Sequence, residues 1–448
     1  MQLPDSLLQS LAEEAGFDRK SFLEAHALPA PVSIRLNSLK KTEPPAAATP
    51  VPWTATGFYL PERPVFTLDP LFHAGAYYVQ EASSMFLERL LTAFLPDEGL
   101  RVLDLCAAPG GKSTLIANVL PEESLLVANE VIRPRSGVLA DNLTKWGRTD
   151  TFVTNNDPRD FQRLPGFFDA VVVDAPCSGS GLFRKDPAAI SEWSDDNVAL
   201  CAQRQQRILA DIWPALREDG LLIYSTCSYS RAENEAILDW LSSHFSVEPL
   251  ALDQLPTGVV ETHTARGNTG YRFWPDKVQG EGFFIAAFRK TAQEAELRLR
   301  NLPKNKRKEE SLFSPWIADV SDYTWVEKNG DYFLLQPEHT AAFDALSQHL
   351  YLRKAGVRLG KLAGKELLPD HELALSVAVN TSVPTLPVDR DAALRYLKRE
   401  EFDYDATGRG WQLVTFDGLG LGWVKVLPNR LNNYLPKDWR ILMDIREN

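Results

Sequence analysis

Two cysteines occupy equivalent places in this sequence, each at the end of an apolar, strand-like run. Cys177 lies in Asp174–Gly179 (DAPCSG), and Cys227 lies in Tyr224–Ser228 (YSTCS). Residues that follow the carboxyl ends of strands in an open α/β sheet line its ligand crevice, so we expect both thiols in one site. Either cysteine alone also fits a small buried apolar residue. Together they favour covalent catalysis, in which a thiolate attacks an electrophilic carbon.

A third segment, Leu103–Lys112 (LDLCAAPGGK), joins a strand-like run to a helical one. Gly110 and Gly111 allow the backbone to approach a ligand closely, and the amino end of a helix favours negative charge. An NTPase phosphate loop would need a glycine where Cys106 stands, and Pro109 lies inside the loop. A dinucleotide loop would need a third glycine that is absent here.

S-adenosylmethionine fits the same loop better, because it ends in an amino acid rather than a pyrophosphate. An acidic residue at the end of the second strand would bind its ribose hydroxyls, and Glu130 is in that place. Asp157, after the third strand, would meet the adenine amine. Each acid alone fits a solvated strand end, but their joint placement indicates this cofactor.

Methylation of a pyrimidine at carbon 5 is one reaction that needs these groups. A thiolate adds to carbon 6 and makes carbon 5 nucleophilic; a base then removes the proton from carbon 5 and the thiolate leaves. Amino-group methyltransferases, the nearest competitor, carry an N-P-P-Y-like tetrapeptide after the fourth strand. The corresponding tetrapeptide here, Asp174–Cys177, lacks that aromatic residue.

The three segments resemble the RNA cytosine-5 methyltransferases of the NOL1/NOP2/Sun family, over about Ile34 to Lys290. Arg135 and Phe183–Pro187 also match family positions. The resemblance implies that Cys227 is the nucleophile and that Cys177 assists product release. It implies that Asp174 and Lys112 face a flipped cytosine. It implies that the residues lining S-adenosylmethionine are Cys106, Ala107, Ala108, Pro109, Gly110, Gly111, Lys112, Glu130, Asp157 and Asp174.

The C-terminal part resembles the bacterial branch of this family that methylates 16S ribosomal RNA. Gly356–Gly360 and Gly418–Lys425 carry the match. The resemblance implies two modules after the catalytic domain, the last of them PUA-like, and RNA of the small ribosomal subunit as partner. Two alternatives stay open: a transfer RNA substrate, and an RNA-binding ribosome-assembly factor with incidental methylation.

Alternating strand and helix patterns from Leu100 onward predict an α/β fold with a mostly parallel, doubly wound sheet. With the resemblance, we expect a Rossmann-like methyltransferase sheet, a small N-terminal domain and C-terminal α+β RNA-binding modules. The expected strands are Arg101–Leu105, Leu125–Glu130, Thr151–Thr154, Asp169–Asp174, Gly220–Ser225 and Phe283–Phe288. The expected helices are Met1–Phe17, Glu81–Leu95, Lys112–Val119, Arg133–Trp146, Asn197–Arg217 and Glu233–Ser243.

We divide the chain into an N-terminal domain (1–80), a methyltransferase domain (81–290), a helix and linker (291–311) and two modules (312–385 and 386–448). On this division the cofactor site is complete by Lys290, so it should survive deletion of everything after Leu312. Turns at Asn329-Gly330 and Asp417-Gly418 predict hairpins in the two modules.

The net charge is −12, which argues against nucleic-acid binding by the chain as a whole. Residues 351–448, however, hold 15 Lys and Arg against 13 Asp and Glu, and Arg353–Lys365 contains five cations and no acid. That run fits either a solvated helix face or an RNA contact.

Four cysteines without a C-x-x-C pair, and no long apolar segment, indicate reduced thiols in a cytoplasmic enzyme without metal or membrane partners.

Overall fold

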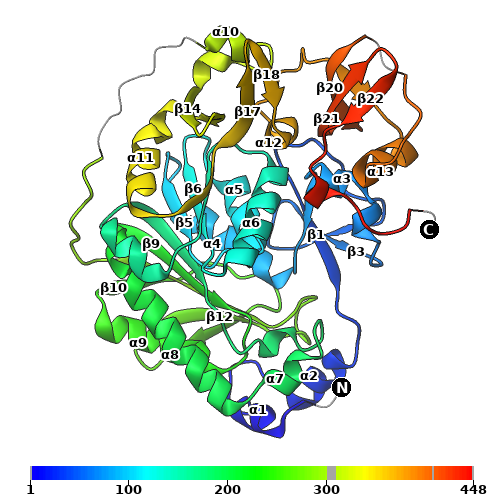
Figure 1. Ribbon diagram of the computed structural model, residues 1–448. Coiled ribbons are helices and arrows are strands. Elements are labelled where there is room, and N and C mark those ends of the chain that lie inside the picture. The colour runs from blue at the N-terminus through cyan, green and yellow to red at the C-terminus, as the bar shows by residue number, and fades with distance from the viewer. Residues whose placement is uncertain (1–2, 300–308, 406–407, 446–448) are drawn as a thin grey trace.

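The computed structural model describes residues 3–299, 309–405 and 408–445. The strands of its central sheet are β5 (Arg101–Asp104), β6 (Leu125–Asn129), β7 (Thr151–Thr154), β8 (Phe168–Asp174), β9 (Leu216–Thr226), β10 (Val247–Leu250), β11 (Val260–His263), β12 (Thr269–Phe273), β13 (Phe283–Lys290) and β16 (Leu352–Ala355). The strand order is β11-β12-β13-β9-β8-β5-β6-β7-β16, and β10 pairs with β13 (Figure 1). Strands β5 to β9 run parallel, and β13 runs antiparallel to β9. The predicted doubly wound α/β sheet is therefore confirmed.

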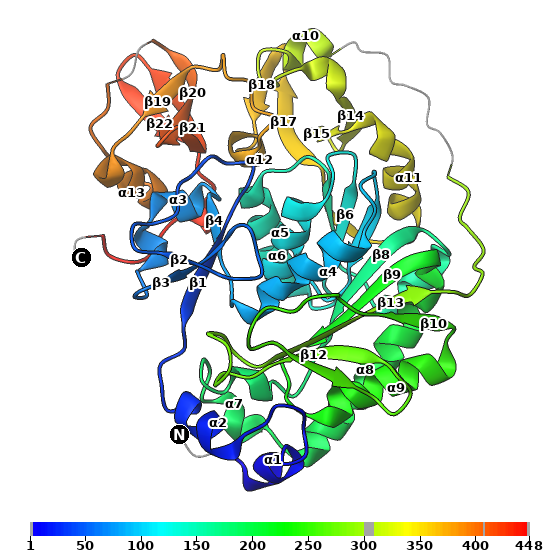
Figure 2. The ribbon, with the colours of Figure 1, turned by 180° about the vertical axis from the view of Figure 1, so that it is seen from behind.

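Helices cover both faces of this sheet, as its apolar parallel strands require. They are α4 (Leu87–Phe94), α5 (Gly111–Val119), α6 (Arg133–Trp146), α8 (Asp195–Ile212) and α9 (Glu235–His244). The short helix α7 (Ala189–Glu192) packs instead against the N-terminal helices. Helices α4 and α5 pack against one face, and α8 and α9 against the other (Figure 2). The chain runs outward from β5 to β6 and β7, then returns to β8 on the other side of β5. This reversal is the switch point at which open α/β sheets bind ligands.

A four-stranded antiparallel sheet precedes the catalytic sheet. Its strands are β1 (Val32–Leu36), β2 (Thr49–Pro50), β3 (Gly57–Leu60) and β4 (Tyr77–Val79), and the helices of this region are α1 (Asp5–Ser10), α2 (Arg19–His26) and α3 (Pro70–His73). The buried Arg35 joins it to α5: Nε donates to Gln80 Oε1 (2.8 Å) and Nη2 donates to Thr114 Oγ1 (2.5 Å). The N-terminal sheet is thereby fixed beside the loop between β5 and α5, the candidate cofactor loop.

The single helix expected over Met1–Phe17 is wrong, although Met1 itself lies outside the described residues. Helix α1 ends at Ser10, and the chain turns at Gly16, whose φ of +75° lies in the left-handed region. Helix α2 then begins after Asp18, whose carboxylate accepts the backbone N–H of Ser21 at 2.8 Å.

Two further four-stranded sheets follow. Their elements are α10 (Glu310–Phe313), β14 (Thr324–Lys328), β15 (Asp331–Leu335), α11 (Thr340–His349), β17 (Val357–Ala363), β18 (Glu366–Pro369), α12 (His371–Leu375), β19 (Thr385–Pro387), α13 (Arg390–Lys398), β20 (Gly410–Phe416), β21 (Leu419–Leu427) and β22 (Arg430–Asn433). Both predicted hairpins are confirmed. Asn329 and Gly330 have φ of +57° and +78°, and Asp417 and Gly418 have φ of +48° and +78°, as two-residue hairpin turns require.

Strand β16 contradicts the expectation that the cofactor-binding sheet is complete by Lys290. It pairs antiparallel with β7, placing Ala355 opposite Phe152. Leu346 of α11 belongs to the same buried core as the catalytic strands. The sequence pattern missed this because an edge strand supplied from about 200 residues further along leaves no local signal.

The helix expected in the segment 291–311 is absent from residues 291–299; α10 begins at Glu310, near the end of the segment, and residues 300–308 lie outside the described residues. Residues 291–299 form neither helix nor strand. The Leu297 N–H donates to the Pro165 carbonyl at 2.8 Å, and the Leu297 side chain packs against the catalytic core.

The basic run Arg353–Lys365 lies in β16, β17 and the turn that follows β17, so the helix-face interpretation is wrong. Lys354 is 6% exposed and forms an ion pair with Glu372. Arg358 and Lys361 both pair with Asp331, at 2.8 Å and 3.8 Å. Acids distant in the sequence thus neutralise much of the cluster, and its support for an RNA contact is weaker than the sequence indicated.

The first and last parts of the chain pack together. Helix α13 lies beside α3 (Figure 1). The Arg390 guanidinium of α13 donates to the Leu68 carbonyl at 3.1 Å, and Leu68 and Ala74 share a buried cluster with Leu386 and Val424. Within the described residues, no helix is both long and apolar enough to span a bilayer.

Candidate active site

The loop between β5 and α5 forms one wall of the crevice at the switch point. Gly110 has a φ of +117°, in the left-handed region, and brings the backbone into the turn that starts α5. Buried Asp104 accepts Ser113 Oγ at 2.6 Å through Oδ2, while Oδ1 has no partner in the described chain. Burial raises the pKa of Asp104 to about 7. A buried oxygen atom that lacks a hydrogen-bond donor is expected where a bound polar cofactor supplies that donor.

Glu130 follows β6 and is joined to that loop through Arg135. The Glu130 side chain is buried; Oε1 accepts the Ile132 N–H at 2.8 Å, and Oε2 lies 3.6 Å from Arg135 Nη1. Arg135 Nη2 in turn donates to the Ala108 carbonyl at 2.7 Å. The arginine therefore positions both the acidic residue and the loop.

Asp157, the third residue after β7, lies at the same edge of the sheet as Glu130. Its carboxylate caps a short helix by accepting the Arg159 N–H at 3.2 Å. It also pairs with Arg159 (3.9 Å) and Arg207 (3.5 Å). These contacts give Asp157 a structural role beside its expected one.

Lys112 and Asp174 face each other across the crevice. Lys112 Nζ lies 2.8 Å from Asp174 Oδ2, and Ser225 Oγ donates to Asp174 Oδ1 at 2.8 Å. Burial is the largest single influence and acts to lower the pKa of Lys112, but the charge of Asp174, the hydrogen bond to it and weaker contributions from Cys227 and Asp104 together outweigh burial, so the net shift is upward. Lys112 consequently stays cationic in its contact with Asp174.

The structure brings the two predicted cysteines together at the ends of β8 and β9. The Cys177 and Cys227 sulfur atoms are 3.1 Å apart, within hydrogen-bonding distance. The pKa of Cys177 is raised well above its ordinary value, first by the bond to Cys227 and then by burial. The raised pKa keeps Cys177 in its thiol form beside Cys227, and either sulfur can be the donor in their contact.

The other two cysteines lie elsewhere. Cys106 is in the loop between β5 and α5, where burial raises the pKa of its thiol. Cys201 is buried on α8. Among the described residues no group of three or more His, Cys, Asp or Glu side chains is arranged to bind a metal.

Sequence reasoning missed Glu233, which holds the two cysteine loops in register. Its fully buried carboxylate accepts Ser178 N (2.7 Å), Ser178 Oγ (2.6 Å) and Ser228 Oγ (2.5 Å). Ser178 and Ser228 directly follow the two cysteines. Gln205 Nε2 donates to the same carboxylate at 3.3 Å. The only sequence signal was an acidic residue six positions after Cys227.

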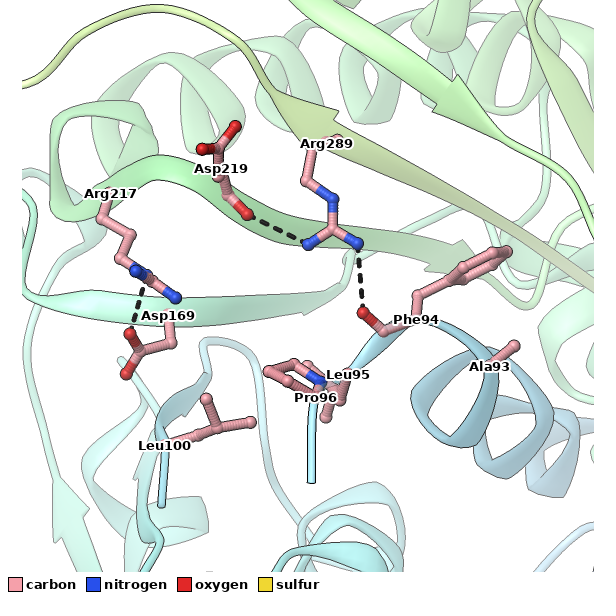
Figure 3. A pocket seen from close by; sticks show the side chains of 9 residues that line it. All are labelled: Ala93, Phe94, Leu95, Pro96, Leu100, Asp169, Arg217, Asp219 and Arg289. Atoms are coloured by element: carbon pink, nitrogen blue, oxygen red, sulfur yellow. Dashed lines mark hydrogen bonds and ion pairs between the residues drawn. The ribbon is translucent and has the colours of Figure 1, made fainter. Parts of the chain in front are cut away.

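A cavity of about 430 Å³ lies at the opposite edge of the sheet, near the amino ends of β5, β8 and β9 (Figure 3). Both arginine side chains that line it form contacts with other parts of the chain. Arg217 pairs with Asp169 at 2.7 Å, and Arg289 donates to the Phe94 and Asp219 carbonyls at 3.1 Å and 3.0 Å. These arginines fasten chain segments together, and the cavity lies away from the cysteines.

Comparison with known proteins finds related family matches in three parts of the chain. Residues 91–289 match the family described as 16S rRNA methyltransferase RsmB/F. Residues 3–82 match the N-terminal domain of 16S rRNA methyltransferase RsmF, and residues 383–441 match the methyltransferase RsmF PUA domain. The resemblance inferred from the three motifs is thereby confirmed.

Individual relatives cover nearly the full chain. A ribosomal RNA small subunit methyltransferase F of Shewanella amazonensis is 30% identical, over 98% of each chain. Another of that name, from Psychromonas ingrahamii, is 32% identical over 91% of this chain and 88% of its own. The solved structure of a methyltransferase homolog protein from Pyrococcus horikoshii is 28% identical with a TM-score of 0.51, covering 64% of this chain and 100% of that one.

Proposed function

The chain belongs to the ribosomal RNA small subunit methyltransferase F family, and from that premise we propose the reaction it performs. It transfers a methyl group from S-adenosylmethionine to carbon 5 of a cytosine in 16S ribosomal RNA. The observation that carries this proposal is the Cys177–Cys227 pair, 3.1 Å apart, at the strand ends beside the Lys112–Asp174 ion pair.

Cys227 is the nucleophile in this proposal. Its sulfur bonds to carbon 6 of the cytosine, and the electron pair of the carbon 5–carbon 6 double bond becomes available at carbon 5. The methyl group that carbon 5 accepts comes from S-adenosylmethionine when it is bound. Carbon 5 then loses its proton, the double bond re-forms, and the bond between carbon 6 and sulfur breaks.

Cys177 would serve the last of these steps. The bond to Cys227 is the largest cause of its raised pKa. Once the Cys227 sulfur is bonded to carbon, the hydrogen bond between the two cysteines of the free enzyme is lost, so that cause is removed and the pKa of the Cys177 thiol falls. Cys177 can then give its proton to solvent water, and the resulting thiolate can take the carbon 5 proton and become a thiol again.

The other groups bind and orient. Asp174 would accept from the cytosine amino group, and Lys112 would donate to the polar edge of the ring. The cofactor would be held by the backbone of Cys106–Lys112, by Glu130 at its ribose, by Asp157 near its adenine and by Asp174. The unpartnered Asp104 oxygen and the buried Glu130 carboxylate fit a cofactor that presents hydroxyl and ammonium groups.

The substrate assignment rests on the N-terminal and PUA matches, which lie outside the catalytic sheet. A small-subunit RNA substrate implies action in the cytoplasm. Bisulfite sequencing of total RNA from a deletion strain tests the assignment. Loss of methylation at a 16S cytosine is expected, whereas loss in a transfer RNA would favour the alternative substrate. Complementation by Cys227→Ala would instead indicate an assembly factor whose methylation is incidental.

A further inference from the structure

A second cavity lies on the outer side of the cofactor loop and takes no part in the chemistry proposed above. Its volume is about 530 Å³, which is in the usual range of small-molecule sites. The N-terminal region contributes Arg63, Phe66, Thr67, Phe72 and Tyr78, and α6 contributes Asn142. The cavity thus joins the N-terminal sheet to the catalytic domain.

Aromatic rings and an arginine form much of its lining. The Phe66 and Phe72 ring centroids are 6.4 Å apart, and the Arg63 guanidinium carbon lies 5.4 Å from the centre of the Phe66 ring. The Arg63 side chain is exposed and forms no ion pair within the described chain. Aromatic side chains and arginine planes are the groups on which proteins stack unpaired bases.

Polar groups in the cavity are also available to a ligand. The Tyr78 hydroxyl and the Asn142 side-chain oxygen form no hydrogen bond among the residues that the structure describes. Burial raises the pKa of Tyr78 to about 12, although Arg35 acts against the shift, so the hydroxyl stays protonated and can donate. A donor and an acceptor beside stacking surfaces suit the hydrogen-bonding edge of a base.

Two contacts place this cavity against the reaction site. Asn142 Nδ2 donates to the Pro109 carbonyl at 2.8 Å. The Tyr78 ring covers Gly111, where an added Cβ would lie 3.3 Å from Cε1. The next residue, Lys112, pairs with Asp174 in the crevice. A strand of RNA that enters the crevice therefore has this cavity directly beside the cofactor loop.

We propose that this cavity binds an unpaired base of the substrate RNA close to the target cytosine. The base stacks on Phe66 and Phe72, Tyr78 and Asn142 contact its polar edge, and Arg63 contacts the adjoining phosphate. Holding a neighbouring base out of its stack would offset part of the cost of flipping the cytosine. This inference rests on the function proposed above.

The first test cross-links RNA to the enzyme in a trapped complex. A 16S transcript containing 5-fluorocytidine should stop the reaction at the covalent Cys227 adduct, because fluorine at carbon 5 cannot leave as a proton. Irradiation with short-wavelength ultraviolet light, followed by peptide mass spectrometry, should find nucleotides attached within residues 63–78. An adduct without such cross-links would overturn the base site and leave the methyltransferase function standing. Absence of the adduct would contradict the function itself.

The second test compares variants that keep the fold. Phe66→Leu should weaken binding of the 16S transcript about five- to a hundredfold, because it removes a stacking surface and retains apolar packing. Arg63→Ala should weaken it and lower the salt-dependence slope by about one phosphate contact. Arg266→Ala, in the exposed turn between β11 and β12, is the matched control and should change neither. All three should bind S-adenosylmethionine normally. RNA affinities within twofold of the control for both cavity variants would overturn the proposal.

Discussion

The sulfur atoms of Cys177 and Cys227 lie 3.1 Å apart, although 50 residues separate them in the sequence. They meet because β8 and β9 are adjacent parallel strands that end at the same edge of the sheet. The two thiols are therefore within hydrogen-bonding distance of each other. In the proposed reaction Cys227 bonds to carbon, whereas Cys177 takes a proton. Each thiol can be tested by a separate substitution.

Replacing the nucleophile should abolish methyl transfer and leave cofactor binding intact. We expect Cys227→Ala to give no detectable turnover, because no sulfur can add to carbon 6. The measurement is incorporation of labelled methyl groups into 16S RNA, with calorimetry for the cofactor. Cys201→Ala, a buried cysteine on α8 outside the site, should remain active. Near-wild-type turnover of Cys227→Ala would falsify the nucleophile assignment.

Removing the second thiol should trap the enzyme on its product. In Cys177→Ala the adduct can form, but the group expected to take the carbon 5 proton is missing. A denaturing gel of the variant mixed with RNA and cofactor should show a shifted, RNase-sensitive band that wild type lacks. If methylation is detected and no shifted band accumulates, Cys177 does not act in product release.

Glu130 should contribute strongly to cofactor affinity. A hydrogen bond to a charged group contributes about 1.5–3 kcal/mol, so Glu130→Ala should weaken S-adenosylmethionine binding at least tenfold. Glu122→Ala removes an exposed acid just before the same strand, β6, at the opposite edge of the sheet. Calorimetry should find that control unchanged. Equal dissociation constants for the two variants would remove Glu130 from the site.

Glu233 should control the rate through the spacing of the cysteine loops. Glu233→Ala removes the common acceptor of Ser178 and Ser228, and small displacements of reacting groups cost up to about a hundredfold in rate. We expect kcat to fall ten- to a hundredfold with little change in KM for RNA.

The control for this prediction is Glu235→Ala. Glu235 is equally buried and pairs with Arg272 at 2.5 Å, but it does not contact the cysteine loops. Both variants should lose thermal stability, and only Glu233→Ala should slow adduct formation on 5-fluorocytidine RNA. If Glu233→Ala and Glu235→Ala lost the same stability and the same activity, Glu233 would have a structural role only.

The catalytic sheet and the places of its motifs could be predicted from the sequence because their signals are local. Apolar runs marked β5 to β9, and the motif residues directly followed those runs, so the strand ends located Lys112, Asp174, Cys177 and Cys227. Parallel pairing then brought them together without further information.

Interactions between distant segments could not be predicted in the same way. The acids that neutralise Arg358 and Lys354 are Asp331 and Glu372, which only the hairpins of the C-terminal sheets bring near. The hydrogen bonds of Glu233 to Ser178 and Ser228 form only when the loops after β8 and β9 meet. Neither arrangement has a periodic pattern, since each depends on tertiary pairing.

Strand β16 leads to the last prediction, which reverses the expectation from sequence. A chain ending after Leu312 would lose β16 and α11, exposing the β7 edge and the core around Phe152. The Tyr351 carbonyl and N–H also hold Asn155 and Asn156, immediately before Asp157. We therefore expect this truncated chain to bind S-adenosylmethionine more weakly and to unfold at a lower temperature than the full chain.

A second truncated chain, ending after Ser382, is the matched control, because it lacks the region matching the PUA domain and retains β16. It should lose RNA affinity while its cofactor dissociation constant stays within about threefold of the full chain. Calorimetry and thermal unfolding of the two truncated chains make the comparison. A 1–312 chain that folds cooperatively and binds the cofactor as tightly as the full chain would show that β16 is dispensable for the site. In that case the contacts of Tyr351 with Asn155 and Asn156 would not support the cofactor pocket.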